Sequence, residues 1–221
     1  MLLEQPTSIL SKIYPKGIFR KNPEDHSVYL TFDDGPIPEV TPWVLDILDR
    51  YGIKATFFMV GDNVRKHPDI YKMVQERGHH IGNHTFNHVR GMRMRNHDYI
   101  DNVKKCDSYF STRLFRPPHG VLRRWTYRYM KDDYDIVFYD VITRDYNAKL
   151  NPDKVLDIVK RYTRNGSIIV FHDSLRSDKT LKYALPKAIE WLKEQGYATN
   201  RAPGSLFISL TPPRYFSSFS I

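Results

Sequence analysis

The sequence predicts an α/β fold built on a parallel β-sheet. Short apolar runs typical of buried strands alternate with longer segments whose apolar residues recur at helical spacing. No glycine- and serine-rich linker separates these segments, and no internal repeat stands out. Because about seven strand-then-helix units require crossover helices between parallel strands, we expect one domain, either a barrel or an open doubly wound sheet.

The expected strands are short and rich in β-branched and aromatic residues. The first reads SVYLTF, and the fourth is stopped by the pair Pro117-Pro118. In chain order they are Ser27–Phe32, Ala55–Val60, His80–His84, Leu114–Arg116, Asp135–Ile142, Ser167–His172 and a weaker one from Tyr197 onward.

The expected helices lie between these strands and carry apolar residues three and four positions apart. Glycines at 52, 78 and 196 end three of them, and Asn151 is a suitable N-cap for a fourth. In chain order they are Val40–Tyr51, Asp69–Arg77, Asp98–Thr112, Arg123–Lys131, Pro152–Thr163 and Leu181–Gln195.

Composition supports a folded domain. Of the 221 residues, 41% are hydrophobic and 27% are charged, which excludes collagen-like and intrinsically disordered chains. The single cysteine, Cys106, can form no internal disulfide and is expected in the core. We expect a core over about 27–210, an N-terminal extension over 1–26 and an irregular tail over 211–221.

The sequence also favours a cytoplasmic location. No apolar run approaches the roughly 20 residues that a membrane-spanning helix needs. The segment Met1–Lys12 lacks the basic start and apolar stretch of a signal peptide, although a trimmed secreted form would look the same. The pattern does not indicate an oligomeric state.

Polar side chains follow the expected strands, at the points where these strands end. Two adjacent carboxylates, Asp33 and Asp34, follow the first strand, and His84 and His88 stand four residues apart after the third. Because the carboxyl ends of parallel strands meet on one face, we expect these side chains in one cleft. Two imidazoles and one carboxylate suit a divalent metal ion with open positions.

Three motifs resemble those of the polysaccharide deacetylases of carbohydrate esterase family 4. They read TFDDGP at 31–36, HTFNH at 84–88 and RPPHG at 116–120, and the resemblance covers roughly residues 28–192. It implies a distorted (β/α) barrel of about seven parallel strands. It also implies a metal-dependent hydrolase that removes acetyl groups from carbohydrates.

The resemblance further implies roles for individual residues. Asp34, His84 and His88 would hold the metal ion, with Zn²⁺ expected first and Co²⁺, Ni²⁺ or Mn²⁺ also suitable. Asp33 would be the general base and His172 the general acid, which suits an imidazole near neutral pH. Arg116 would orient Asp33, and Asp145 would stabilise the charged form of His172. The oxyanion and substrate contacts would come from His119, through its backbone N–H, and from Pro118 and Tyr146.

Three positions depart from the family pattern. Ile142 and Tyr146 stand where the fourth motif usually has aspartate and tryptophan, and His119 stands where the third has an aromatic residue. None of the catalytic roles above is lost. We expect a reshaped pocket for the acetyl group and the sugar.

The predicted function is removal of N-acetyl groups from an amino-sugar glycan or glycan precursor. An O-acetyl esterase acting on a polysaccharide such as xylan would use the same residues. A sugar-binding relative without catalysis is a second alternative, although the catalytic set is complete. A nucleic-acid binder is disfavoured, because no helix-turn-helix, zinc-finger or RNA-recognition signature accompanies the charge.

The net charge of +9 raises the question of an anionic substrate. Excess arginines and lysines most often form a solvated face. Several arginines, however, follow the chemical motifs, and we hypothesise that this rim attracts an anionic sugar. The rim consists of Arg90, Arg93, Arg95, Arg123, Arg124, Arg128, Arg144 and Arg176.

Overall fold

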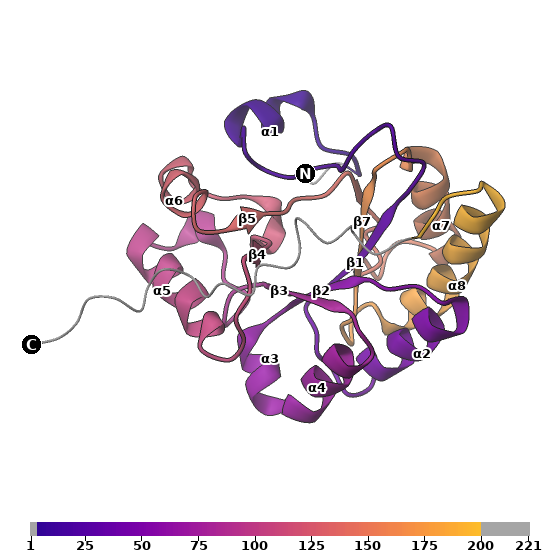
Figure 1. The fold of residues 1–221 in the computed structure, drawn as a ribbon, viewed down its shortest axis with the longest axis horizontal. Helices are drawn as coiled ribbons and strands as arrows, with labels where there is room; N and C mark the ends of the chain where they lie inside the picture. Colours follow the sequence, from indigo (N-terminus) through magenta and orange to yellow (C-terminus); the bar gives the residue numbers. More distant parts are fainter. Residues whose placement is uncertain (1–3, 200–221) are drawn as a thin grey trace, which may run out of the picture.

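A computed structural model of the chain, which describes residues 4–199, has one curled sheet of seven strands (Figure 1). All strand pairs are parallel, in the order β5-β4-β3-β2-β1-β7-β6. This arrangement confirms the predicted α/β fold with a distorted (β/α) barrel. The strands are β1 Tyr29–Asp33, β2 Thr56–Met59, β3 His80–Asn83, β4 Leu114–Phe115, β5 Asp135–Ile136, β6 Val141–Ile142 and β7 Ile168–His172.

Helices surround the strands, and Figure 1 shows α2, α7 and α8 together on one side and α5 and α6 on the other. Two short 3₁₀ helices, η1 Gly91–Arg93 and η2 Pro118–Gly120, follow β3 and β4. The α-helices are α1 Ser8–Ile13, α2 Thr41–Tyr51, α3 Gly61–Lys66, α4 Pro68–Glu76, α5 Asn96–Asp107, α6 Arg124–Met130, α7 Pro152–Tyr162 and α8 Asp178–Glu194.

The prediction of one strand over Asp135–Ile142 is wrong. The structure divides it into β5 and β6, which lie at opposite edges of the sheet. Between them, the backbone N–H of Val137 donates to Phe115 O at 2.8 Å and that of Asp140 donates to Ile168 O at 3.0 Å. The curl of the sheet explains the division, because it brings the two edges close enough for one segment to reach both.

Several other boundaries also differ from the prediction. The helices α1 and α3 were not predicted, and α5 ends at Asp107 rather than Thr112. Of the strand expected from Tyr197 onward, the structure describes residues 197–199, in which Ala198 forms an isolated bridge with Ser27. Residues from 200 onward, including the expected tail over 211–221, lie outside the described residues.

The main core lies between the sheet and the helices α2, α7 and α8. Val44 and Leu48 of α2 are buried in one cluster with Leu181 and Leu185 of α8. At about 25 cal/mol per Å² of apolar surface, each of these side chains stabilises the fold by roughly 1.5–3 kcal/mol. Packing of this kind holds β1 and β7 rigidly, and these two strands carry much of the site.

Local sequence signals fix several helix ends. Gly52 ends α2 in the left-handed conformation, at a φ of 68°, which glycine adopts without strain. The Oδ1 atom of Asn151 accepts from the backbone N–H of Asp153 at 3.0 Å, so this residue is the N-cap of α7, as predicted. Cys106 is buried, which confirms its expected place in the core. Over residues 4–199, no helix combines the length and apolarity needed to cross a membrane.

Candidate metal centre and catalytic cleft

A cavity of about 540 Å³ lies at the carboxyl ends of the strands. Strands β1 and β7 pair in a register that sets Asp33 opposite His172. The loops after β3 and β4 bring His84, His88 and His119 to the same cavity. The structure thus brings together residues from four strand ends, as the topology of a parallel sheet requires.

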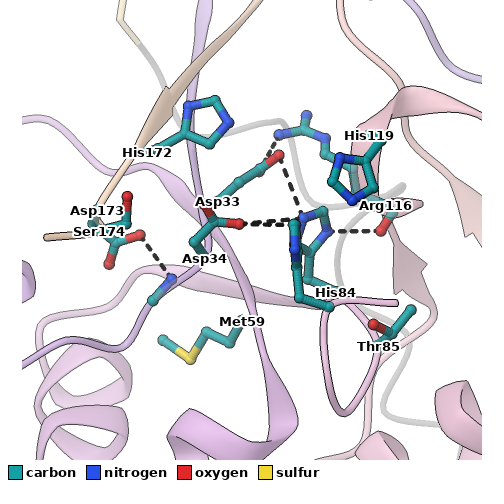
Figure 2. Close-up of polar contacts among 12 residues, drawn as sticks. Asp33, Asp34, Met59, His84, Thr85, Arg116, His119, His172, Asp173 and Ser174 are labelled. Atoms are coloured by element: carbon teal, nitrogen blue, oxygen red, sulfur yellow. Dashed lines mark hydrogen bonds and ion pairs between the residues drawn. The ribbon is translucent and has the colours of Figure 1, made fainter. Parts of the chain in front are cut away.

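Three side chains form a candidate metal centre. Among residues 4–199, Asp34, His84 and His88 are the group whose ligand atoms all lie within 4.8 Å of one another. Figure 2 shows the carboxylate of Asp34 directed toward His84. The Oδ1 atom of Asp34 lies 3.2 Å from His88 Nε2 and 3.7 Å from His84 Nε2. This oxygen is buried and has no hydrogen-bond partner. A buried oxygen of this kind is unfavourable unless a cation or a donor reaches it, so the donor set fits a divalent ion.

The protonation states also suit a metal ligand set. The ring Nδ1–H of His84 donates to the backbone carbonyl of Arg116 at 2.8 Å, which leaves Nε2 with its lone pair facing Asp34. Burial lowers the pKa of His84 to about 4, and the neighbouring His88 acts in the same direction. Burial alone would raise the pKa of Asp34, but His88 and His172 lower it overall. At neutral pH the centre therefore offers neutral imidazole and carboxylate.

Asp33 is held by a buried arginine. The guanidinium of Arg116 donates to Asp33 Oδ1 at 2.7 Å, and the other carboxylate oxygen lies 3.9 Å from His84 Nε2. Arg116 also donates to Thr31 Oγ1 at 2.7 Å and to the carbonyl of Phe138 at 3.0 Å. The ring of Phe58 lies 4.0 Å below the guanidinium. Held by these contacts, Arg116 is positioned to fix the orientation of the Asp33 carboxylate.

His172 forms a buried pair with Asp145. The ring Nδ1–H of His172 donates to Asp145 Oδ1 at 2.8 Å, so Nε2 is the ring nitrogen left for a ligand. Burial alone would lower the pKa of His172, but the charge and hydrogen bond of Asp145 outweigh it and raise the pKa to about 9. Tyr146 packs its ring edge-on against His172, with centroids 4.7 Å apart. The pair therefore provides a protonated imidazole at neutral pH.

His119 lies beside His88 of the candidate metal centre. Its ring packs edge-on against His88, with centroids 4.8 Å apart, and it lines the cavity together with Pro117, Ile142 and Tyr146. The neighbouring Pro118 is buried in η2 and does not line the cavity. Figure 2 shows His172 above the two aspartates and His119 to their right.

Backbone strain is concentrated around this site. Five residues other than glycine have positive φ among residues 4–199, and they are Asp34, Thr85, His88, His119 and Arg144. A left-handed backbone costs such a residue roughly 1–2 kcal/mol. Two metal-centre residues and His119 thus hold conformations that only the surrounding fold maintains, which is typical of functional sites.

One buried residue of the site has no predicted role. Asp173, directly after His172, accepts from the hydroxyl of Thr41 at 2.6 Å and from the backbone N–H of Gly35 at 3.2 Å. Burial raises its pKa to about 8. It connects the end of β7 to the turn that carries the two aspartates. The only feature of the sequence that could have indicated a role for Asp173 is its position directly after His172, at the end of a strand.

Two arginines of the predicted rim line the cavity, and two others form ion pairs with carboxylates. Arg90 and Arg176 line the cavity, and neither has a carboxylate within ion-pair distance in residues 4–199. By contrast, Arg95 pairs with Asp98, and Arg144 pairs with Glu4 at 2.6 Å. Only part of the predicted rim is thus available to a ligand in the cavity.

The comparisons with known proteins agree with this geometry. The family model described as polysaccharide deacetylase matches residues 20–135. A peptidoglycan-N-acetylglucosamine deacetylase of Bacillus cereus is 34% identical over 77% of this chain and 83% of its own length. A chitooligosaccharide deacetylase of Azorhizobium caulinodans is 32% identical over 80% of this chain and 93% of its own. Other relatives are longer: the chain spans 40% of a peptidoglycan-N-acetylglucosamine deacetylase of Listeria monocytogenes.

A solved structure has the same fold. The crystal structure of the Bc1960 peptidoglycan N-acetylglucosamine deacetylase superposes with a TM-score of 0.79 at 29% sequence identity. The match covers 89% of this chain and 99% of that one. The fold is therefore shared with a peptidoglycan N-acetylglucosamine deacetylase.

Proposed function

Because the chain belongs to the polysaccharide deacetylases of carbohydrate esterase family 4, we propose that it hydrolyses N-acetyl groups of an amino-sugar glycan or glycan precursor. One observation carries this proposal. A candidate metal centre, a buried carboxylate held by Arg116 and an imidazole held by Asp145 line a single cavity. Metal-assisted amide hydrolysis uses a Lewis acid, a general base and a general acid together.

The metal ion would be held by Asp34, His84 and His88. Zn²⁺ is the proposed ion, and this nitrogen and oxygen donor set also suits Co²⁺, Ni²⁺ and Mn²⁺. When bound, such an ion acts as a Lewis acid that makes water a better nucleophile near neutral pH.

The remaining roles fall to the chain's own residues. Asp33 accepts a proton from the water as its oxygen bonds to the acetyl carbon, while Arg116 keeps the carboxylate in position. The backbone N–H of His119 donates to the oxyanion. His172 gives its proton to the sugar nitrogen as the C–N bond breaks, and acetate and the free amine leave. Asp145 keeps His172 protonated beforehand, consistent with the raised pKa of its ring.

The substrate is proposed to be an acetylated carbohydrate that bears negative charge. The net charge of +9 supports electrostatic attraction, and Arg90 and Arg176 bring part of it to the cavity itself. A cytoplasmic location, predicted from the sequence, stays a prediction that cell fractionation would test.

An O-acetyl esterase remains the alternative within the same chemistry. Both reactions pass through a tetrahedral oxyanion, so Asp33 and the oxyanion donor would serve either. Only amide hydrolysis needs a general acid at the leaving group, because the nitrogen leaves poorly unless it is protonated. The buried His172–Asp145 pair therefore favours the amide.

The proposal is tested by acetate release from N-acetylglucosamine oligomers after incubation with Zn²⁺ or Co²⁺. Asp33→Asn and His172→Ala should each abolish release, and a chelator should do the same reversibly. Release that survives both substitutions would contradict the assigned roles. Release from acetylated xylan alone would favour the esterase, and bound metal without any release would favour a sugar-binding protein.

A further inference from the structure

Arg90 has an unusual environment for a surface arginine. Its Nε–H donates to Nε2 of His119 at 3.3 Å, so one edge of the guanidinium is held against the cavity wall. Both residues line the cavity that contains Asp34 and His88. No carboxylate of residues 4–199 lies within ion-pair distance of Arg90. Its Nη groups therefore remain as charged donors beside the candidate metal centre.

The contact gives the side chain of His119 a function apart from its backbone. Because Nε2 accepts from Arg90, the ring proton lies on Nδ1. A phenylalanine at this position would keep a ring against His88 but would offer Arg90 no acceptor. His119 thus orients a guanidinium that would otherwise be a freely moving side chain in solvent.

A second arginine lines the same cavity. Arg176 follows β7 and lies four residues after His172. It too has no carboxylate partner in the described part of the chain. Arg176 therefore adds positive potential to the cavity, whereas Arg90 offers an oriented donor.

We propose that Arg90, positioned by His119, is a specificity-determining residue that binds an anionic substituent of the substrate, a carboxylate or a phosphate, close to the acetamido group. This inference rests on the proposed deacetylase function and names its substrate class. A guanidinium edge with two free N–H groups matches either oxyanion in a forked, charge-assisted hydrogen bond. Arg93 and Arg128, by contrast, do not line the cavity.

The test compares matched substrates with and without the charge. One pair is a disaccharide containing N-acetylmuramic acid and its methyl ester, and the other is N-acetylglucosamine 6-phosphate and N-acetylglucosamine. For the wild-type enzyme, we expect kcat/KM to favour the charged member of at least one pair. The pair that shows this preference identifies the carboxylate or the phosphate as the ligand.

In Arg90→Gln, the ratio of kcat/KM for the charged substrate to kcat/KM for its neutral counterpart should fall about tenfold. This is the size expected for losing one charge-assisted hydrogen bond. His119→Phe should lower the ratio in the same direction. Arg128→Gln removes the same charge from α6, outside the cavity, and should leave the ratio unchanged. Equal ratios in all four proteins, or equal losses in Arg90→Gln and Arg128→Gln, would overturn the proposal.

A binding measurement separates this inference from the deacetylase function. Calorimetry with the deacetylated, charged disaccharide and its methyl ester measures recognition without turnover. Weaker binding of the charged ligand by Arg90→Gln than by the wild type supports anion recognition even if no acetate is released. Absence of release from every substrate would count against the deacetylase, whereas unchanged binding would count against Arg90.

Discussion

The carboxylate of Asp145 accepts two hydrogen bonds from His172, one from the backbone N–H and one from the imidazole ring of that histidine. One carboxylate oxygen accepts from the backbone N–H of His172 and the other from the ring Nδ1–H, each at 2.8 Å. The two bonds fix the position of the residue at the end of β7 and the rotation of its ring. The charge of Asp145 also keeps the imidazole protonated in a buried position.

Replacing Asp145 with asparagine should lower stability in a pH-dependent manner. The pKa of His172, about 9, lies above its ordinary value of 6.5, so the charged pair stabilises the fold fully below pH 6.5. This stabilisation is lost as the pH rises through 9. In metal-free protein, urea unfolding should show a deficit of about 3 kcal/mol for Asp145→Asn at pH 6 and a much smaller one at pH 10. A deficit independent of pH would contradict the charged pair.

Removing one imidazole should weaken metal binding strongly. His84→Ala takes away a donor of the three-residue centre, and we expect the dissociation constant for Zn²⁺ to rise at least about a hundredfold. Calorimetry or competition with a chromogenic chelator measures this dissociation constant. His97→Ala, in α5 and outside the cavity, is the matched control and should bind as the wild type does. Equal affinities of the two variants would exclude His84 as a ligand.

The Arg116–Asp33 pair should show strong coupling. Both side chains are buried, so Arg116→Gln leaves an unpaired carboxylate and should cost roughly 3–5 kcal/mol of stability. The double variant Arg116→Gln/Asp33→Asn removes both charges and should be more stable than Arg116→Gln alone. A double-mutant cycle of unfolding free energies measures this coupling. Additive effects, within about 0.5 kcal/mol, would mean that the two groups do not interact.

Adding a methyl group at Gly35 should disturb the turn that carries the aspartates. A Cβ there would clash with Oδ2 of Asp173. We expect Gly35→Ala to lose about 2–3 kcal/mol and most of the activity, with partial recovery of stability in Gly35→Ala/Asp173→Ala. Gly52→Ala is the control, because its Cβ would meet nothing within 4 Å and only backbone strain would remain. Thermal unfolding of these three variants and the wild type would reveal whether Asp173 causes the clash.

The sequence predicts the alternation of strands and helices well, because buried strands such as Tyr29–Asp33 and helices such as Thr41–Tyr51 have strong local patterns. It does not predict that the segment Asp135–Ile142 forms both edge strands of the sheet, β5 and β6. The apolar pattern of that segment is continuous, and its division depends on the curl of strands distant in sequence. Likewise, the polar run Gly61–Lys66 has few apolar residues, and its helix depends on contacts with the loop at Phe86.

The same distinction applies to the site. The carboxylates and histidines were predicted as a group because they follow strands and match motifs. The buried contact of Asp173 with Gly35 and the contact of Arg90 with His119 join residues from separate loops. No spacing in the sequence encodes such contacts. They follow only from the positions that the assembled sheet gives to those loops.

The pairing of β1 with β7 has a consequence for folding. Thr31 donates its hydroxyl to the carbonyl of Ile169, a residue 138 positions away, and the same pair of strands sets Asp33 beside His172. Asp33 and His172, the proposed base and acid, therefore meet only after the last strand has docked against the first. Closing so long a loop is slow, so we expect refolding to be rate-limited by this docking. On a ribosome, a chain whose β7 has not yet emerged would have its candidate metal ligands but would lack His172, the proposed catalytic acid.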